Sequence, residues 1–385
     1  MSNKIASKSA AKISLLWLPI AIWYVLSILP PHSALTGVDA HFYYTAAKHW
    51  VAQKPLYTEI RSGFIYLPTS AALMSLIAFL PITAFAILFK LISVIVLTLG
   101  VYSAAANFVD ENNPRCFFIT LLITVILSQA ALFEGQLHVM TTGVLLLGYA
   151  AIAKERWWQA AIFLTLALAL KPTSLVLYLL AIGVYPKAGW RILLVSAVAF
   201  LLSLIAQSPT YVLEQYHAYA KTFMAAMHYD GGHPAHWATL FGAIAFYTHY
   251  QISGAAQFIT RIVLAFLVYL SALFFKSKLS KQDVAFFILA VGMCYLMLFN
   301  SRTENNDYIM VAPAIGYLLY WSVNNKNWLA SILLILITLT SALSWSVTKA
   351  ITPYNTNWMN PSAITIFLVY LYFWAKCRII ETKHY

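Results

Sequence analysis

Long apolar runs separated by short polar segments fill almost the whole chain, and no other feature constrains its fold as strongly. Of the 385 residues, 62% are hydrophobic and only 9% are charged, whereas soluble domains carry about 25% charged residues. Runs that approach about 20 residues can cross a bilayer as helices. The sequence therefore predicts an all-α polytopic membrane protein, with residues 1–385 forming a single integral membrane domain. The candidate spans are residues 13–29, 64–80, 84–107, 117–133, 137–153, 157–170, 173–185, 190–207, 256–275, 283–300, 308–323, 328–348 and 361–379.

The N-terminal segment sets the orientation of these runs. Lys4, Lys8 and Lys12 precede the first run, and no small-residue cleavage site follows it. We therefore interpret residues 13–29 as a retained transmembrane helix and not as a signal peptide. By the positive-inside rule, the N-terminus is expected in the cytoplasm.

Two later segments decide whether the remaining loops obey this rule. If residues 64–80 cross the membrane, nearly every later cluster of Lys and Arg falls outside; if they form a juxtamembrane helix, these clusters are cytoplasmic. Residues 157–170 and 173–185 must likewise be two short helices that meet at Lys171 and Pro172, because one long helix would place every later basic cluster on the wrong side of the membrane. A lysine at such a break is a candidate functional residue.

The resulting topology has about 12 transmembrane helices, both termini in the cytoplasm, and two large outer loops at residues 30–83 and 208–255. We expect the protein in the cytoplasmic membrane. Nearly all of its histidines and most of its acids fall on the outer face, which predicts an active site on that face. The outer acids are Asp39, Glu59, Glu134, Glu214, Asp230, Glu304 and Asp307.

Asp39 is the first of these acids and lies in the motif "GVDAHFYY" of the first outer loop. A carboxylate among aromatic side chains at a lipid and water boundary can have a pKa suited to accepting a proton from a hydroxyl. The alternative is a helix N-cap, because an amphipathic helix is predicted to follow. The two roles can coexist. Other polar or aromatic residues of this loop are His41, Tyr43, Tyr44, Tyr57, Glu59, Arg61 and Tyr66.

Five short motifs occur in a fixed order along the chain. They are G-x-D-x-x-x-Y (Gly37, Asp39, Tyr43), PLY (Pro55 to Tyr57), F-x-Y-x-P (Phe64, Tyr66, Pro68), GQ (Gly135, Gln136) and LKP (Leu170 to Pro172). In this order the chain resembles the GT-C glycosyltransferases of family 87, the polyprenol-phosphate-mannose-dependent mannosyltransferases. The resemblance covers roughly residues 15 to 325.

This resemblance implies a GT-C fold and an inverting hexosyltransferase, with mannose as the expected sugar. Asp39 would be the catalytic base, and Gln136 and Lys171 would lie near the donor phosphate or the sugar. The donor would be a polyprenyl-phosphate sugar, which is a substrate, so no cofactor is expected. The acceptor would be a lipid or a glycan, and membrane lipids would surround the protein. Tyr43 and Tyr66 are further candidates for substrate binding, and Arg302 and Arg61 for stabilising the leaving phosphate.

Two positions depart from the family pattern. Where the family tends to have Gly-Gln-x-Asn, this chain has "GQLH", so His138 replaces the amide; where a His often precedes a Tyr, Asp307 precedes Tyr308. His138 is a candidate partner for a sugar hydroxyl, with an ordinary packing histidine as the alternative. For Asp307 the alternative to substrate binding is a local ion-pair turn with Arg302.

The loop "HYDGGHPAHW", residues 228–237, concentrates histidines around one acid. Its glycines and proline favour a turn-rich loop over a rigid set of metal ligands, so we predict no metal site. His228 and Asp230 remain candidates for substrate contact, with a solvated loop as the alternative.

Other functions receive less support from the sequence. The formal net charge of +12 is spread between apolar runs, so no nucleic-acid partner is expected. Motifs for nucleotide binding, zinc proteolysis and serine hydrolysis are lacking. A transporter or flippase remains the alternative function, because many-span bundles with a few buried charges also describe carriers. An inactive GT-C relative acting as a scaffold is a third interpretation.

Overall fold

The computed structural model describes residues 17–18, 37–58, 63–108, 114–227, 233, 235–352 and 356–383. Within these ranges the chain forms helices joined by turns and loops, with no strand. This confirms the predicted all-helical class. The first predicted span, residues 13–29, lies almost entirely outside the described residues.

Among the described residues, seven helices are long and apolar enough to cross a membrane, and three shorter apolar helices accompany them. The predicted number of about 12 crossings therefore stays a prediction. The long helices are α4 (Ile82–Phe108), α5 (Pro114–Glu134), α9 (Pro186–Ala206), α12 (Gly254–Lys276), α13 (Lys281–Phe299), α15 (Trp328–Ile351) and α16 (Met359–Lys383). The shorter ones are α6 (Leu137–Ala153), α7 (Trp157–Leu170) and the segment formed by η1 (Pro172–Ser174) and α8 (Leu175–Val184); α14 (Ala312–Asn324) follows η2 (Asn305–Val311).

The two segments predicted as outer loops contain helices of their own. Residues 30–83 include α2 (Val38–Val51) and α3 (Pro68–Ser75), and residues 208–255 include α10 (Pro209–Met227) and α11 (Leu240–Thr248). With eight residues, α3 is only about 12 Å long and cannot cross a bilayer. Residues 64–80 thus contain a short helix that does not span, as the positive-inside rule requires.

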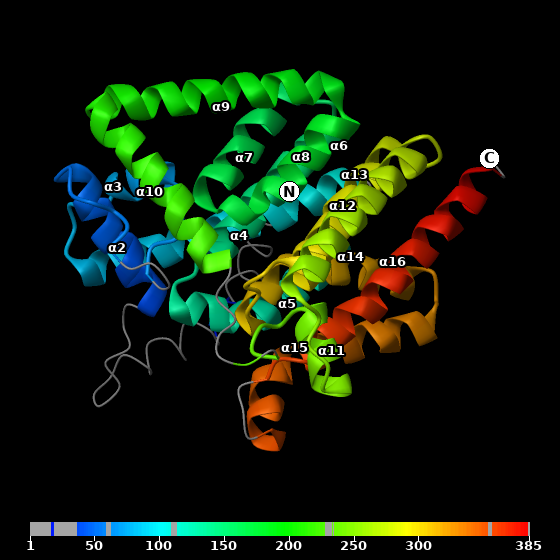
Figure 1. The fold of residues 1–385 in the computed structure, drawn as a ribbon. Coiled ribbons are helices and arrows are strands. Elements are labelled where there is room, and N and C mark those ends of the chain that lie inside the picture. The colour runs from blue at the N-terminus through cyan, green and yellow to red at the C-terminus, as the bar shows by residue number, and fades with distance from the viewer. Residues whose placement is uncertain are drawn as a thin grey trace.

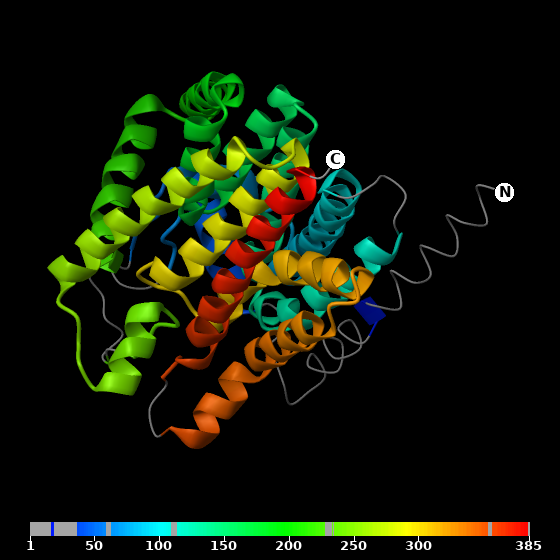
Figure 2. The same cartoon turned by 90° about the vertical axis from the view of Figure 1, so that its right-hand side faces the viewer.

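Close helix packing holds the centre of the bundle together. At the crossing of α4 and α6, a Cβ added to Gly100 would lie 2.4 Å from the Gly143 carbonyl oxygen, and one added to Gly143 would lie 2.5 Å from that of Val96. Only glycine allows two helix backbones to approach this closely. Figures 1 and 2 show α12, α13 and α16 side by side, and Figure 1 shows α2 and α3 on the opposite side of the molecule.

Two helices expose most of their apolar surface. In the most apolar 18-residue stretch of each helix, only 22% of α9 and 11% of α12 are buried inside the protein. In a membrane protein such faces contact lipid, because large exposed apolar surfaces are unfavourable in water. Figure 1 shows α9 lying across one end of α7 and α8.

The predicted break at Lys171 is present. α7 ends at Leu170, Lys171 has extended backbone angles, and Pro172 starts η1. The buried hydroxyl of Ser70 in α3 lies 2.6 Å from the Ala169 carbonyl oxygen and 2.7 Å from that of Leu170. These carbonyls lose their helical partners at the break, so α3 satisfies the end of α7 and fixes where Lys171 points.

Candidate active site

Asp39 occupies the first turn of α2, where a negative charge is favoured by the helix dipole. The N-cap is Gly37, without a side-chain capping bond, so the prediction that Asp39 caps its helix is wrong. Gly37 has φ 71°, and an added Cβ would lie 2.3 Å from the Glu134 carbonyl oxygen. The start of α2 therefore packs directly on the backbone at the end of α5, which places Asp39 beside the turn between α5 and α6.

Burial raises the pKa of Asp39 from 3.8 to about 6. Lys171 and a hydrogen bond from the Gln136 side chain act in the opposite direction, while the charges of Glu134 and Asp307 raise the pKa further. Asp39 is only partly buried, so part of this residue stays accessible from outside the protein. A carboxylate with this pKa is ionised near neutral pH and is a better proton acceptor than an ordinary aspartate.

Gln136 connects Asp39 to the rest of the site. Gly135, with φ 70°, makes the turn that ends α5, and Gln136 is the N-cap residue of α6. Its amide nitrogen also lies 3.5 Å from the Glu304 carboxylate, and its oxygen lies 3.0 Å from Nδ1 of His138. One amide group thus contacts two acids through its nitrogen and an imidazole through its oxygen.

Three groups converge on Nδ1 of His138, which is buried. Besides Gln136, the Asp307 carboxylate lies at 2.8 Å and the Lys171 ammonium at 2.9 Å. A protonated Nδ1 donates to an oxygen of Asp307 or Gln136, whereas an unprotonated Nδ1 accepts from Lys171. Not all of these contacts are hydrogen bonds at once, so the proton on His138 determines which neighbour it holds.

Lys171 borders a small cavity of about 80 Å³. Its ammonium lies 5.6 Å from the ring centre of Tyr66, in cation–π geometry. Tyr66, Arg302 and Asp307 also line this cavity. Predicted residues from three separate parts of the sequence therefore meet at one small space. Its remaining lining residues are Ile65, Pro172, Thr173, Phe223, Ala226, Asn300 and Ser301.

Tyr43 lies beneath the site and has no exposed surface. Its hydroxyl lies 3.0 Å from that of Tyr66 and accepts a hydrogen bond of 3.4 Å from the Leu137 backbone N–H. In this position Tyr43 joins α2 to the start of α6 and supports the Tyr66 ring.

The turn before η2 supplies the other acids. Glu304 and Asp307 form a reciprocal capping box, in which the Glu304 N–H donates to Asp307 at 2.9 Å. The Arg302 guanidinium stacks over the Trp237 ring at 5.0 Å. Because Asp307 also contacts His138, it belongs to the site as well as to a local turn.

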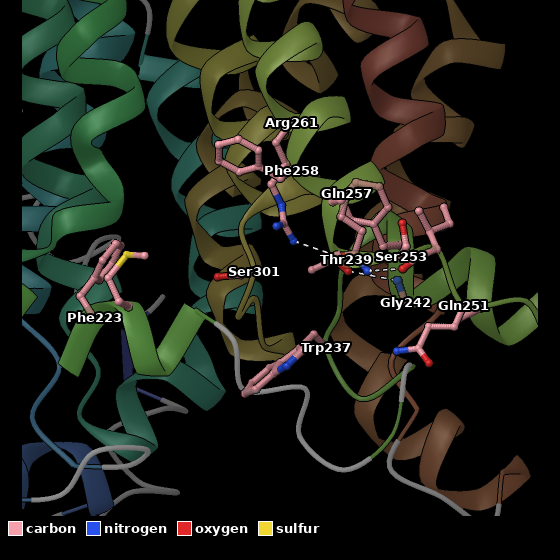
Figure 3. Close-up of a pocket in the computed structure, with 16 residues that line it drawn as sticks. Phe223, Trp237, Thr239, Gly242, Gln251, Ser253, Gln257, Phe258, Arg261 and Ser301 are labelled. Atoms are coloured by element: carbon pink, nitrogen blue, oxygen red, sulfur yellow. Dashed lines mark hydrogen bonds between the residues drawn. The ribbon is translucent and has the colours of Figure 1, made fainter. Parts of the chain in front are cut away.

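A second, much larger cavity of about 780 Å³ adjoins the first, and both are lined by Phe223 and Ser301. It lies between α10, α11 and α12, and Figure 3 shows the Arg261 side chain pointing into it from α12. Sequence reasoning did not single out Arg261. A charge within the predicted span 256–275 was the available signal.

Lys90 is another residue that the sequence analysis missed, although it interrupts the apolar run of α4. It is 7% exposed and donates a 2.9 Å hydrogen bond to the carbonyl oxygen of Phe133 at the end of α5. A cation at this place is favourable for a helix C-terminus. Lys90 therefore fixes the α5 end on which Gly37 packs.

Three predicted site residues, Arg61, His228 and Asp230, lie outside the described residues. Among the residues that are described, no group of three or more His, Cys, Asp or Glu side chains could hold a metal ion.

Comparison with known proteins gives one family match. The sequence model of glycosyltransferase family 87 matches residues 64–301, more than half of the chain. No curated protein matches the sequence. The matched segment contains Gln136, His138 and Lys171 but neither Asp39 nor Asp307, which only the fold brings to them.

Proposed function

Because the chain belongs to glycosyltransferase family 87, its activity is glycosyl transfer, and we propose that it is an inverting enzyme with Asp39 as the catalytic base. One observation carries this proposal: Asp39, with a pKa of about 6, is hydrogen-bonded to Gln136 next to Lys171 and a small cavity. The family match supports the transfer reaction, and this geometry supports the assignment of the base.

In the proposed reaction, the Asp39 carboxylate accepts the proton of an acceptor hydroxyl while the acceptor oxygen attacks the anomeric carbon of the donor sugar. The bond from that carbon to the donor phosphate oxygen breaks, and its electron pair leaves with the phosphate. Attack opposite the leaving group inverts the anomeric configuration. In this proposal Gln136 and His138 orient sugar hydroxyls, because their side chains can donate and accept hydrogen bonds.

The proposed donor is a polyprenyl-phosphate hexose, with mannose as the first candidate, and the proposed acceptor is a lipid or glycan on the outer face of the cytoplasmic membrane. The large cavity beside α12 supports a lipid-linked substrate. α12 exposes Phe258, Ile262 and Phe266 next to it, so a lipid chain can reach the cavity from the membrane.

The depth of Lys171 in the membrane separates the transferase from the transporter alternative. Carriers bind their substrate near the bilayer midplane. Lys171 lies where α7 ends. Its ammonium contacts His138 at the start of α6 and lies over the Tyr66 ring, and Asp307 of η2 lines the same cavity. The charged groups of the site lie where helices begin and end, and carriers also build their sites at broken helices, so access of water to Lys171 from one side only is the result that would support the transferase.

Transfer of radiolabelled mannose from a polyprenyl-phosphate donor by the purified protein tests this function. Replacing Asp39 by Asn keeps the shape but removes the base, so we expect a loss of about 10²- to 10⁴-fold in rate. Glu214→Gln, an exposed acid on α10, is the matched control and should leave the rate unchanged.

Thermal unfolding of the same variants should be measured as a control for a folding defect. The pKa of Asp39 is raised from 3.8 to about 6 in the folded state, so its ionisation lowers stability as the pH rises between these two values, and the loss is complete above pH 6. Asp39→Asn should therefore be at least as stable as the wild type at pH 8. Undiminished transfer by this variant would contradict the assignment of the base.

A further inference from the structure

Arg261 carries a positive charge that its neighbours do not compensate. It is half-buried in α12, where Nε donates 2.8 Å to the Phe299 carbonyl oxygen and Nη2 donates 3.1 Å to the Gln257 side chain. Its guanidinium stacks on Phe241 at 5.2 Å. All of these partners are neutral, and no described residue lining the cavity is acidic. A charge placed in a largely apolar helix is costly unless an opposite charge pairs with it.

Lys171, unlike Arg261, has acidic residues around it and one of them in the lining of its cavity. Asp307, Asp39 and Glu304 all interact with its charge, and His138 contacts its ammonium. Asp307 lines the cavity of about 80 Å³ next to Lys171; Arg302 also lines it, and its charge interacts with Glu304. The two cations of this cavity are thus already countered by three carboxylates. The Lys171 pocket is therefore better suited to a neutral sugar with its hydroxyls than to an anion.

The large cavity offers hydroxyl donors in addition to the Arg261 charge. Thr239 accepts a 3.1 Å hydrogen bond from the Gly242 N–H, and Ser253 accepts one of 3.3 Å from the Ala256 N–H. Each hydroxyl keeps its own hydrogen for donation to a ligand. Figure 3 shows Arg261 pointing into the cavity, with Ser301 to one side and Trp237 across from it.

We propose that the Arg261 cavity binds the phosphate of the lipid-linked donor, a phosphodiester, with the sugar in the Lys171 pocket and the lipid chain leaving over α12. This inference rests on the proposed function. Phe223 and Ser301 line both cavities, so the bond between sugar and phosphate would lie at their junction. When that bond breaks, its electron pair stays on the phosphate oxygen, and Arg261 stabilises the added negative charge.

Binding of three lipids to the purified protein, measured by scintillation proximity, tests this site. Undecaprenyl phosphate is the probe, undecaprenol is the same chain without the phosphate, and phosphatidylglycerol is an ordinary anionic lipid. The wild type should prefer undecaprenyl phosphate to both others. Arg261→Gln should lower this preference over undecaprenol by about 10- to 100-fold, and Arg261→Lys should retain most of it.

Two further variants remove a positive charge elsewhere and serve as controls for Arg261→Gln. Lys171→Gln should keep the preference for the phosphate, and so should Lys349→Gln, which removes an exposed charge from the end of α15. Unchanged undecaprenol binding by Arg261→Gln would show that the cavity is still formed. A lost preference for undecaprenyl phosphate would then be due to the missing charge of Arg261.

The possible outcomes distinguish failure of the proposed phosphate site from failure of the proposed transferase function. The proposed site is overturned if Arg261→Gln keeps the preference, if Lys171→Gln loses it, or if phosphatidylglycerol binds equally well with the same dependence on Arg261. If the preference depends on Arg261 but the wild type transfers no sugar from a polyprenyl-phosphate donor, the site stands and the proposed function fails. If sugar is transferred but Arg261→Gln binds like the wild type, the function stands and this site fails.

Discussion

Nδ1 of His138, at the start of α6, lies 2.8 Å from the carboxylate of Asp307 in η2, and both side chains are about 95% buried. At these two positions the family resemblance leads us to expect Asn and His. Since the two residues touch, we infer that the two departures compensate for each other, with the imidazole on the opposite side of the same contact.

This exchange predicts a double-mutant cycle. His138→Asn and Asp307→His each disturb the contact, so each should slow transfer by about 10- to 100-fold. The double variant restores an amide facing an imidazole and should recover most of the rate. Transfer rates of all four proteins measure the coupling, and simple multiplication of the two single effects would count against compensation.

The pKa of Asp39 predicts how activity depends on pH. Only ionised Asp39 accepts a proton, so kcat/KM should rise with pH to a plateau, with a midpoint near pH 6. Lys171 lowers this pKa and Glu134 raises it. Lys171→Met should therefore move the midpoint to higher pH, and Glu134→Gln should move it to lower pH. Shifts in the same direction would refute this electrostatic account.

Gly37 should not tolerate a side chain. Alanine at this position would have a positive φ and a Cβ 2.3 Å from the Glu134 carbonyl oxygen. We expect Gly37→Ala to lower the unfolding free energy by about 1–3 kcal/mol and to reduce transfer, because Asp39 must shift. Thermal unfolding and transfer rates check this. Val38→Ala, at an exposed position of the same helix turn, is the control and should change neither the unfolding free energy nor the transfer rate.

Lys90 should support the site from a distance. Lys90→Met removes the hydrogen bond to the Phe133 carbonyl and leaves the end of α5 without it. We expect a loss of about 1–3 kcal/mol in stability together with slower transfer. Lys90→Arg keeps a donor and should restore part of both. If the Met variant unfolds and transfers like the wild type, Lys90 does not position the α5 end.

Several features of the fold could be predicted because they depend on local sequence. Apolar runs and the asymmetry of basic clusters predicted an all-helical bundle and the short helix within residues 64–80. Pro172 after Lys171 predicted the break between α7 and η1, since proline cannot continue the hydrogen bonding of the preceding helix. The order of short motifs also led to family 87, which the sequence comparison confirmed.

Local patterns were less reliable for individual side chains. Asp39 was expected to cap its helix, but the N-cap is Gly37, because that position packs against the α5 backbone and has a positive φ. Substrate contact by Tyr43 stays a prediction; its side chain is fully buried, with its hydroxyl 3.0 Å from that of Tyr66. A sequence motif shows that such residues are near one another, not which of them faces the cavity.

By itself, the sequence determined that this protein is a helical membrane protein of family 87, because hydrophobicity and motif order are properties of the chain. Only the tertiary structure decided that His138 meets Asp307, that Lys90 supports the end of α5, and that Arg261 faces a cavity beside the Lys171 pocket. Residues this far apart come together only through helix packing, which the close crossing at Gly100 and Gly143 specifies in three dimensions.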